Sequence, residues 1–206
     1  IRVLTHEIMN TVTPIASLSS ALSQNLDAYD TEDVRSALGT ISSSSEGLIS
    51  FVQSYRSLTH IAAPVRKAFY LRDLVNDSVT IAQANWPSAR VSYHELSEDI
   101  ILYADYGQIS QVMNNLIKNA VQAGASDIDI TASIDKRERT VINVANNGEP
   151  ISETGREQIF VPFYTTKGVS GTGVGLSLCR QIIRLNGGTI NLTSSTPEAT
   201  VFTIVL

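Results

Sequence analysis

The spacing of apolar residues over the first 60 positions constrains the fold of this chain more than any other feature. Between Ile1 and Leu22 they recur every three or four positions, which predicts one stripe along a helix. After a polar stretch from Asn25 to Thr31, the spacing resumes and continues to Leu58. Two long helices with a short connection predict an antiparallel hairpin. Because the rest of the chain would cover the apolar seam only in part, we predict that two hairpins pair in a four-helix bundle.

The pattern changes after Ala62-Ala63-Pro64, from long helical stripes to alternating strands and helices. Residues 127–134 alternate between apolar and polar, which is typical of a half-buried strand. The predicted strands are 90–96, 100–104, 127–134, 141–145, 189–192 and 200–206, and the predicted helices are 108–123 and 175–185. We therefore predict an α+β protein with a helical hairpin at 1–61, a linker at 62–66 and an α/β sandwich at 67–206.

Composition excludes several classes of partner. The net charge of -5 argues against nucleic-acid binding, because proteins that bind the phosphate backbone usually carry a basic face. No run approaches the roughly 20 apolar residues that span a bilayer, so we expect no membrane contact from this part of the protein. The only cysteine, Cys179, stands among apolar positions of a predicted helix and is interpreted as a core residue. A chain without a disulfide is compatible with the cytoplasm, where we expect it.

The helical pattern is already running at Ile1, so we interpret the chain as part of a longer protein, which could carry a membrane anchor elsewhere. Within the first helix, His6 lies about 200° from both Leu4 and Ile8, opposite the apolar stripe. An exposed imidazole beside Glu7 suits phosphoryl acceptance, because the carboxylate can orient the ring or take its proton. Position alone would favour an ordinary surface histidine, so the surrounding motif decides between the two readings.

Two further patterns indicate a phosphate site. Asn115 and Asn119 are four residues apart on a predicted helix, so their amides lie on one face. The glycine-rich run 171–176 precedes another predicted helix, whose free N–H groups and positive dipole end attract phosphate. The run does not directly follow a strand, as a Rossmann fingerprint requires, and it lacks the G-K-[ST] of a P-loop.

Five motifs in order carry a family resemblance. They are H-E-I-M-N at 6–10, N-L-I-K-N at 115–119, N-N-G-E-P at 146–150, F-V-P-F-Y-T-T-K at 160–167 and G-T-G-V-G-L at 171–176. Together they resemble the H, N, G1, F and G2 boxes of the sensor histidine kinases of two-component signalling. The resemblance covers nearly the whole chain. It implies a dimerisation and phosphoacceptor hairpin followed by an ATP-binding domain of the GHKL (Bergerat) type.

The resemblance also implies the ligands of the second domain, ATP and Mg²⁺. It places Mg²⁺ on the amide oxygens of Asn115 and Asn119, and a hard cation that keeps several waters needs few protein oxygens. The segment between Pro150 and Gly171 resembles the mobile lid over ATP. The implied ATP contacts are Asn115, Lys118, Asn119, Asn146, Gly148, Thr166, Lys167, Gly171, Thr172, Gly173, Val174, Gly175 and Leu176.

The implied reaction is an ATP-dependent autokinase reaction at His6, with Glu7 beside it. In a homodimer, the γ-phosphoryl group would pass to His6 and then to an aspartate of a response-regulator receiver domain. Asn10 lies one helical turn after His6, where similar kinases hold a water that removes phosphate from the partner. Asn10 is therefore the candidate residue for phosphatase activity.

The G1 motif departs from the family pattern at two positions. Asn146 replaces the usual aspartate that binds the adenine amino group, and Pro150 replaces a glycine. An asparagine still offers one acceptor and one donor, the pair that it uses on adenine elsewhere, so ATP binding is expected. These departures nevertheless motivate an alternative, a phosphatase-dominant or degenerate kinase that acts as a signalling scaffold.

A third reading is an ATPase of the same nucleotide fold that uses ATP as a conformational clamp. Such an enzyme needs a glutamate at the start of the N-box helix to activate water. This chain has Gln108, Gln111 and Asn115 there and no carboxylate, which disfavours the clamp ATPase.

Overall fold

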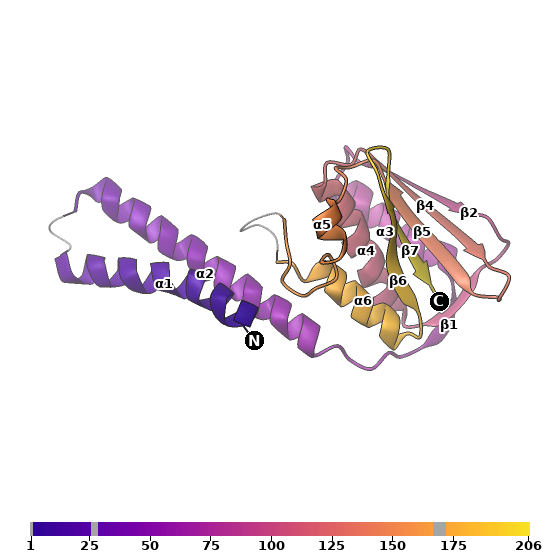
Figure 1. The fold of residues 1–206 in the computed structure, drawn as a ribbon, viewed down its shortest axis with the longest axis horizontal. Coiled ribbons are helices and arrows are strands. Elements are labelled where there is room, and N and C mark those ends of the chain that lie inside the picture. Colours follow the sequence, from indigo (N-terminus) through magenta and orange to yellow (C-terminus); the bar gives the residue numbers. More distant parts are fainter. Residues whose placement is uncertain (1, 26–28, 167–171) are drawn as a thin grey trace. The chain divides into compact units, whose positions relative to one another are not determined.

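The computed structural model describes residues 2–25, 29–166 and 172–206, with the backbone alone at 2–7 and 25. The chain divides into two compact units (Figure 1). One is the helical hairpin within residues 1–60, and the other is an α/β domain of residues 61–164 and 173–206. No helix in the described ranges is both long and apolar enough to cross a membrane.

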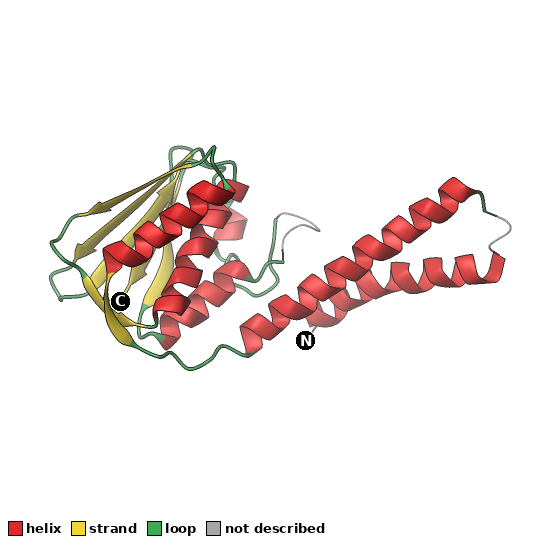
Figure 2. Ribbon diagram, turned by 180° about the vertical axis from the view of Figure 1, so that it is seen from behind, coloured by secondary structure: helices red, strands yellow, loops and turns green. Residues whose placement is uncertain are grey.

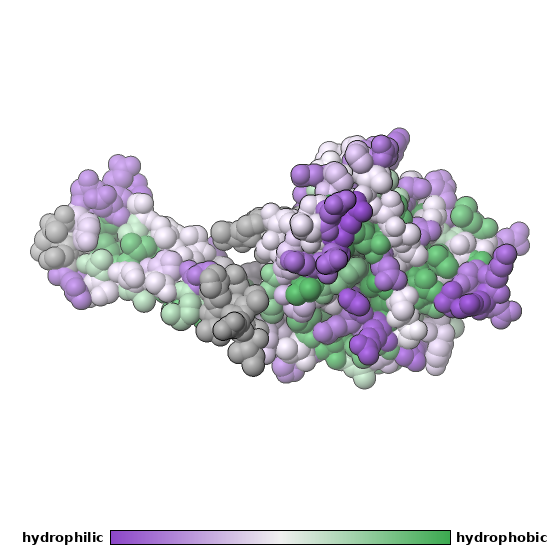
Figure 3. All heavy atoms as spheres, viewed as in Figure 1, coloured by the Kyte–Doolittle hydropathy of each residue, from purple (hydrophilic) through white to green (hydrophobic). Residues whose placement is uncertain are grey.

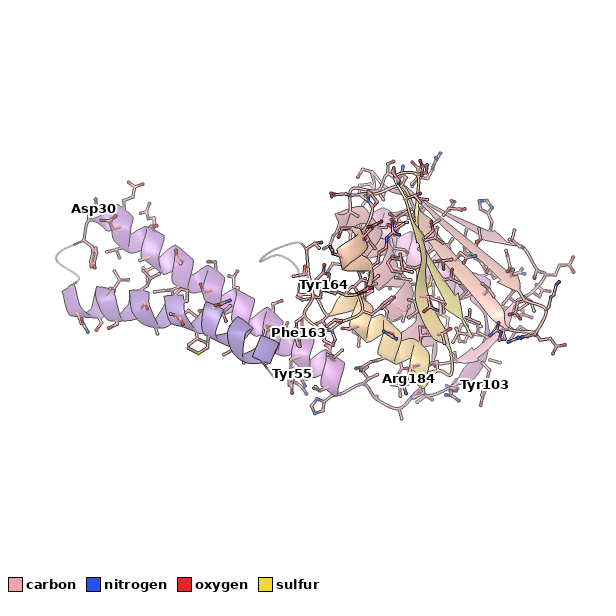
Figure 4. The ribbon with its side chains drawn as sticks, viewed as in Figure 1. Asp30, Tyr55, Tyr103, Phe163, Tyr164 and Arg184 are labelled. Atoms are coloured by element: carbon pink, nitrogen blue, oxygen red, sulfur yellow. The ribbon has the colours of Figure 1, made fainter. Side chains whose placement is uncertain are left out.

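The hairpin consists of α1 (Arg2–Asn25) and α2 (Thr31–Thr59), which run antiparallel. These bounds confirm the two helices that the apolar stripes predict. Asp30 begins α2, because its side chain accepts hydrogen bonds from the backbone N–H groups of Glu32 and Asp33, each at 2.8 Å (Figure 4). Helix α1 continues through Pro14.

The hairpin leaves apolar side chains in solvent. None of the residues of α2 is buried, and Leu38, Ile49 and Val52 are each more than half exposed. At 100° per residue these three lie within about 60° of one another, on one face of α2. Figure 3 shows apolar residues in green on the hairpin surface. The single chain therefore exposes an apolar face that runs along α2.

The α/β domain is built on a five-stranded sheet with the strand order β2-β4-β5-β7-β6. Its strands are β2 (Arg90–Glu95), β4 (Asp127–Ile134), β5 (Thr140–Asn146), β6 (Thr189–Ser195) and β7 (Thr200–Val205). The β2 and β4 strands are parallel, and the other neighbours are antiparallel. A second, two-stranded sheet pairs β1 (Lys67–Tyr70) with β3 (Ile101–Ala104).

Three helices cover one face of the large sheet (Figure 2): α3 (Leu71–Asn85), α4 (Tyr106–Gln122) and α6 (Gly175–Leu185). A short helix, α5 (Glu153–Arg156), lies between β5 and α6 in the sequence. Alternate residues of β4 are buried under the helices, which confirms the alternation seen in the sequence. The largest fully buried side chains include Leu71, Leu74, Ile109, Met113, Ile117, Ile128, Ile130, Ile142, Ile182 and Ile183.

The apolar pattern does not predict α3 or β1. The buried face of α3 begins with Leu71, Leu74 and Val75 but continues with Ser78 and Ala82. Small side chains at the second half of the stripe allow close packing, yet they give no hydrophobic periodicity to detect. The strand β1 has four residues, too few for an alternation to be read.

Candidate functional site

The N-box asparagines lie where α4 meets the start of α6. A Cβ atom placed on Gly175, the first residue of α6, would be 3.6 Å from Oδ1 of Asn115 and 4.0 Å from Nδ2 of Asn119. The structure thus brings together residues that are 60 positions apart in the sequence. Their amide groups border the end of α6 that the sequence predicts to bind phosphate.

Cys179 lies one turn further along α6 and supports Asn115. Its sulfur is 3.9 Å from the carbonyl oxygen of Val112 and hydrogen-bonds with the Asn115 side chain. Burial raises the pKa of the thiol to about 12, so it stays protonated, and its predicted place in the core is confirmed. Within the described part of the chain, the two amide groups have no other hydrogen bond, which leaves Oδ1 of Asn115 available to a ligand.

In the described part of the chain, no side chain caps the start of α6. Val174 precedes the helix with its own side chain buried, and the Ser177 hydroxyl donates to the Val174 carbonyl at 2.8 Å instead of accepting from a backbone N–H. Among the described residues, no side chain caps the first N–H groups of the helix, as expected of an anion-binding helix end.

The G1 motif packs against the other end of α4. A Cβ atom on Gly148 would be 2.8 Å from the Ala123 carbonyl oxygen, so only glycine fits there. Asn146 is 6% exposed, and its Nδ2 donates to the Thr200 carbonyl at 3.3 Å while its Oδ1 accepts from the Gly148 N–H at 3.1 Å. An amide has two donor hydrogens and two acceptor lone pairs, so one of each remains for a ligand.

The F and G2 motifs are joined by their backbones. The N–H of Phe163 donates to the Gly173 carbonyl at 2.8 Å, and a Cβ atom on Gly173 would lie 2.4 Å from the Phe163 carbonyl carbon. Gly173 also has a φ of +61°, which favours glycine. Figure 4 labels Phe163 and Tyr164 on this segment. The described parts of the N, G1, F and G2 motifs thus form one connected region around α4 and the start of α6.

The remaining predicted residues take several positions. The side chains of Lys118, Thr166 and Thr172 are exposed, and Leu176 is half-buried. Asn10 is exposed on α1. Lys167 and Gly171 lie outside the described residues, as do the side chains of His6 and Glu7, whose backbone belongs to α1.

Sequence reasoning missed the residues that hold the motifs in place. Thr200 orients Asn146, and the Thr200 hydroxyl pairs at 2.8 Å with that of Ser195, which accepts from the Ile151 N–H. Asn147 accepts from the N–H groups of Ser126 and Asp127, both at 3.0 Å. These partners are 20 to 54 residues away in the sequence, so no local pattern indicates them.

Comparison with known proteins identifies the family. The family of histidine kinase-, DNA gyrase B-, and HSP90-like ATPases matches residues 104–206, half of the chain. The chain belongs to this family. The nucleotide-free catalytic domain of the histidine kinase ThkA has the same fold, with a TM-score of 0.61 and 33% identity over 68% of this chain and 94% of that domain. The predicted relationship to sensor histidine kinases and the predicted GHKL domain are both confirmed.

Longer histidine kinases also match the hairpin. The sensor histidine kinase ZraS of Escherichia coli is 27% identical over 206 residues, which cover 98% of this chain and 43% of ZraS. The structure of ThkA in complex with the response regulator protein TrrA matches 98% of this chain and 59% of that chain, with 26% identity and a TM-score of 0.71. The chain thus spans less than half the length of ZraS.

Proposed function

We propose that this chain is the core of an ATP-dependent protein-histidine autokinase. The observation that carries the proposal is the position of the Asn115 and Asn119 side chains, which lie within about 4 Å of where a Cβ atom on Gly175 would be, at the start of α6. Side-chain amide oxygens and the first backbone N–H groups of a helix meet there, and this combination suits a triphosphate. Family membership supports the same reading.

The donor set at this site fits Mg²⁺ as the companion of ATP. Asn115 and Asn119 would hold the ion through neutral amide oxygens, and when bound it neutralises charge on the phosphates. Oδ1 is the Asn115 atom nearest to where a Cβ atom on Gly175 would be, at 3.6 Å, so it is the proposed ligand atom. Asn146 binds adenine with its remaining acceptor and donor.

The proposed transfer has two steps. A ring nitrogen of His6 attacks the γ-phosphorus of ATP, a nitrogen–phosphorus bond forms, and the bond to the bridging oxygen breaks with release of ADP. The Glu7 carboxylate takes the proton that the ring loses. The phosphoryl group then passes from His6 to an aspartate oxygen on a response-regulator receiver domain. The complex of ThkA with TrrA supports a partner of this class.

The hairpin is proposed to form a homodimer. Leu38, Ile49 and Val52 expose an apolar face of α2, and Met9 on α1 is 56% exposed. Burying such a side chain is worth about 1.5–3 kcal/mol, and a second copy offers the same face in return. Asn10, exposed one turn after His6, is proposed to hold a water for phosphatase activity.

The autokinase is tested by incubating the chain with Mg²⁺ and γ-labelled ATP. We expect label that is labile in acid, stable in alkali and absent from His6→Ala. His94→Ala is the matched control, because His94 lies on β2 and is exposed there, paired with Asp129 at 3.6 Å. Label that survives His6→Ala would refute the assignment. Measurable ATP binding without any label would instead favour the phosphatase-dominant scaffold, which the asparagine at position 146 motivates.

A further inference from the structure

The segment between the hairpin and the first strand is bound to the α/β domain at both of its ends. Gln108 donates from Nε2 to the carbonyl oxygen of Ala62 at 2.9 Å. The N–H of Val65 donates to Oδ2 of Asp105 at 2.8 Å, and the Arg66 guanidinium donates to the Leu185 carbonyl at 2.7 Å. Residues 62–66, which the sequence predicts to be a linker, thus have three hydrogen bonds to the domain.

Asn186 joins the groups that hold the segment. It is 8% exposed, and its Oδ1 accepts from the Asp105 N–H at 2.9 Å. Its Nδ2 donates to Oε1 of Gln108 at 2.9 Å and to the Ile182 carbonyl at 3.0 Å. A buried amide with three hydrogen bonds has one fixed orientation, because any other would leave polar atoms unsatisfied. We call Asp105, Gln108 and Asn186 the clasp.

The clasp lies on both helices of the nucleotide site. Asp105 caps α4 and accepts from the Gln108 N–H at 3.0 Å. Asn186 is the C-cap of α6 and lies two positions after Arg184, which is labelled in Figure 4. The opposite part of α4 carries Asn115, ten residues or about 15 Å further along the helix axis. The segment is therefore attached to the same two helices that form the proposed ATP site.

We propose that the clasp residues are positioning residues that make 62–66 a fixed part of the nucleotide-binding domain, so that the domain reorients about His60–Ile61. Helix α2 ends at Thr59, and His60 still donates its N–H to the Arg56 carbonyl at 2.9 Å. Only two residues, His60 and Ile61, lie between the end of α2 and the clasped segment, and neither is bonded to the α/β domain by a hydrogen bond in the described part of the chain. If the two-residue pivot already lets ATP reach the histidine, lengthening it lowers the effective concentration of ATP there, roughly as the −3/2 power of the free tether length.

Hydrogen exchange tests the clasp without reference to activity. In the intact chain we expect the Val65 amide to exchange at least about ten-fold more slowly than an unstructured amide. Asn186→Ala should remove this protection, and Asn76→Ala, at an exposed position of α3, should not. Gln108→Met has nearly the same volume without the polar atoms, so it tests the clasp even where Asn186→Ala does not fold. An unprotected Val65 amide in the intact chain would overturn the proposal.

Two matched insertions locate the pivot, and this test rests on the proposed autokinase. Four Gly-Ser residues between His60 and Ile61 lengthen the free tether about three-fold and should slow His6 phosphorylation about five-fold. The same insertion between Ala63 and Pro64 lies inside the clasped segment, forms a bulge, and should leave the rate nearly unchanged. ATP affinity should be equal in both chains. Equal slowing by both insertions would overturn the pivot, whereas a lack of label in the parent chain would refute the autokinase and leave the exchange test valid.

Discussion

The α/β domain buries its large apolar side chains, whereas the hairpin leaves several of its own exposed. In the domain, Ile130 and Ile142 are fully buried between the sheet and its helices. In the hairpin, Leu38 and Val52 are each 54% exposed, and α2 contains no buried residue. The domain is complete as a single chain, whereas the hairpin requires a second surface to cover its apolar face. This difference agrees with the proposal that the domain binds nucleotide and that the hairpin provides the dimer interface and the phosphate acceptor.

The largest expected effect compares truncations in the two regions. Ile130→Ala should lower the free energy of unfolding of the domain by about 2–5 kcal/mol, because it leaves a cavity in a closed core. Leu38→Ala should leave that free energy unchanged. Urea unfolding followed by the fluorescence of Trp86, the only tryptophan, reports on the domain, because Trp86 ends α3. A loss of similar size with Leu38→Ala would contradict the comparison.

Charge on the exposed face of α2 should strongly weaken pairing of the hairpins. Ile49→Glu with Val52→Glu should weaken dimerisation by more than about ten-fold, because two carboxylates would be desolvated at the interface. Ser43→Glu is the control, since Ser43 is exposed about 140° around the helix from Leu38. Sedimentation velocity over a range of concentrations measures the association. An unchanged dimer in the double variant would place the interface elsewhere.

A single amide-to-acid change tests the polar packing of the domain. Asn146→Asp replaces the Nδ2 donor to the Thr200 carbonyl with a carboxylate oxygen, so we expect a loss of about 1–3 kcal/mol at neutral pH. Asn143→Asp is the matched control, because Asn143 accepts from the Thr203 hydroxyl through Oδ1 and an aspartate retains that bond. Urea unfolding of both variants measures the change in the free energy of unfolding that each substitution causes. Equal stability of the two variants would mean that the hydrogen bond from Nδ2 of Asn146 to the Thr200 carbonyl does not stabilise the domain.

Replacing a glycine by alanine should raise the stability of the hairpin and lower the stability of the domain. Gly39 lies within α2 with open space around it, so Gly39→Ala should stabilise the hairpin by up to about 1 kcal/mol. Gly124 also has open space but a φ of +78°, so Gly124→Ala should destabilise the domain by about 1–2 kcal/mol. Thermal unfolding measured by circular dichroism gives both values. If both substitutions change the stability in the same direction, the open space around each glycine determines the effect and the positive φ of Gly124 does not.

The smallest effect concerns the acid sensitivity of the clasp. The backbone N–H groups of Gln108 and Val65 hold the pKa of the Asp105 carboxyl below its ordinary value. A lowered folded-state pKa gives stabilisation that is fully present above the ordinary aspartate pKa of about 4. It is lost as the pH falls through the lower folded-state value. Protection of the Val65 amide, corrected for intrinsic exchange, should decline over that range, and Asp105→Asn should remove the decline.

Much of the fold could be predicted from periodicity. The ranges 127–134 and 175–185 coincide with β4 and α6, since their apolar faces are long and regular. Helix α3 could not be predicted, because Ser78 and Ala82 complete its buried face. Periodic spacing reports burial only where the buried side chains are large.

The sequence predicts which motifs form the candidate site, but it does not predict how their side chains are positioned or which residues hold them. The spacing of Asn115 and Asn119 places their amides on one face of α4, and the structure sets this face against Gly175. The partners that orient the motif residues, Cys179 and Thr200, come from distant elements and have no pattern of their own. Long-range hydrogen bonds of this kind depend on the completed fold, so they are visible only in the structure.

The most direct test of the division between the two regions is calorimetric titration of Mg²⁺-ATP into the intact chain and into the variant with Ile49→Glu and Val52→Glu. If the domain is complete by itself, the monomeric variant binds ATP with the same dissociation constant and a stoichiometry of one per chain. Asn115→Ala, which removes an amide beside Gly175, should abolish or greatly weaken binding in both backgrounds. The account would be contradicted if the variant with Ile49→Glu and Val52→Glu lost ATP binding along with dimerisation while its Trp86 fluorescence still showed a folded domain.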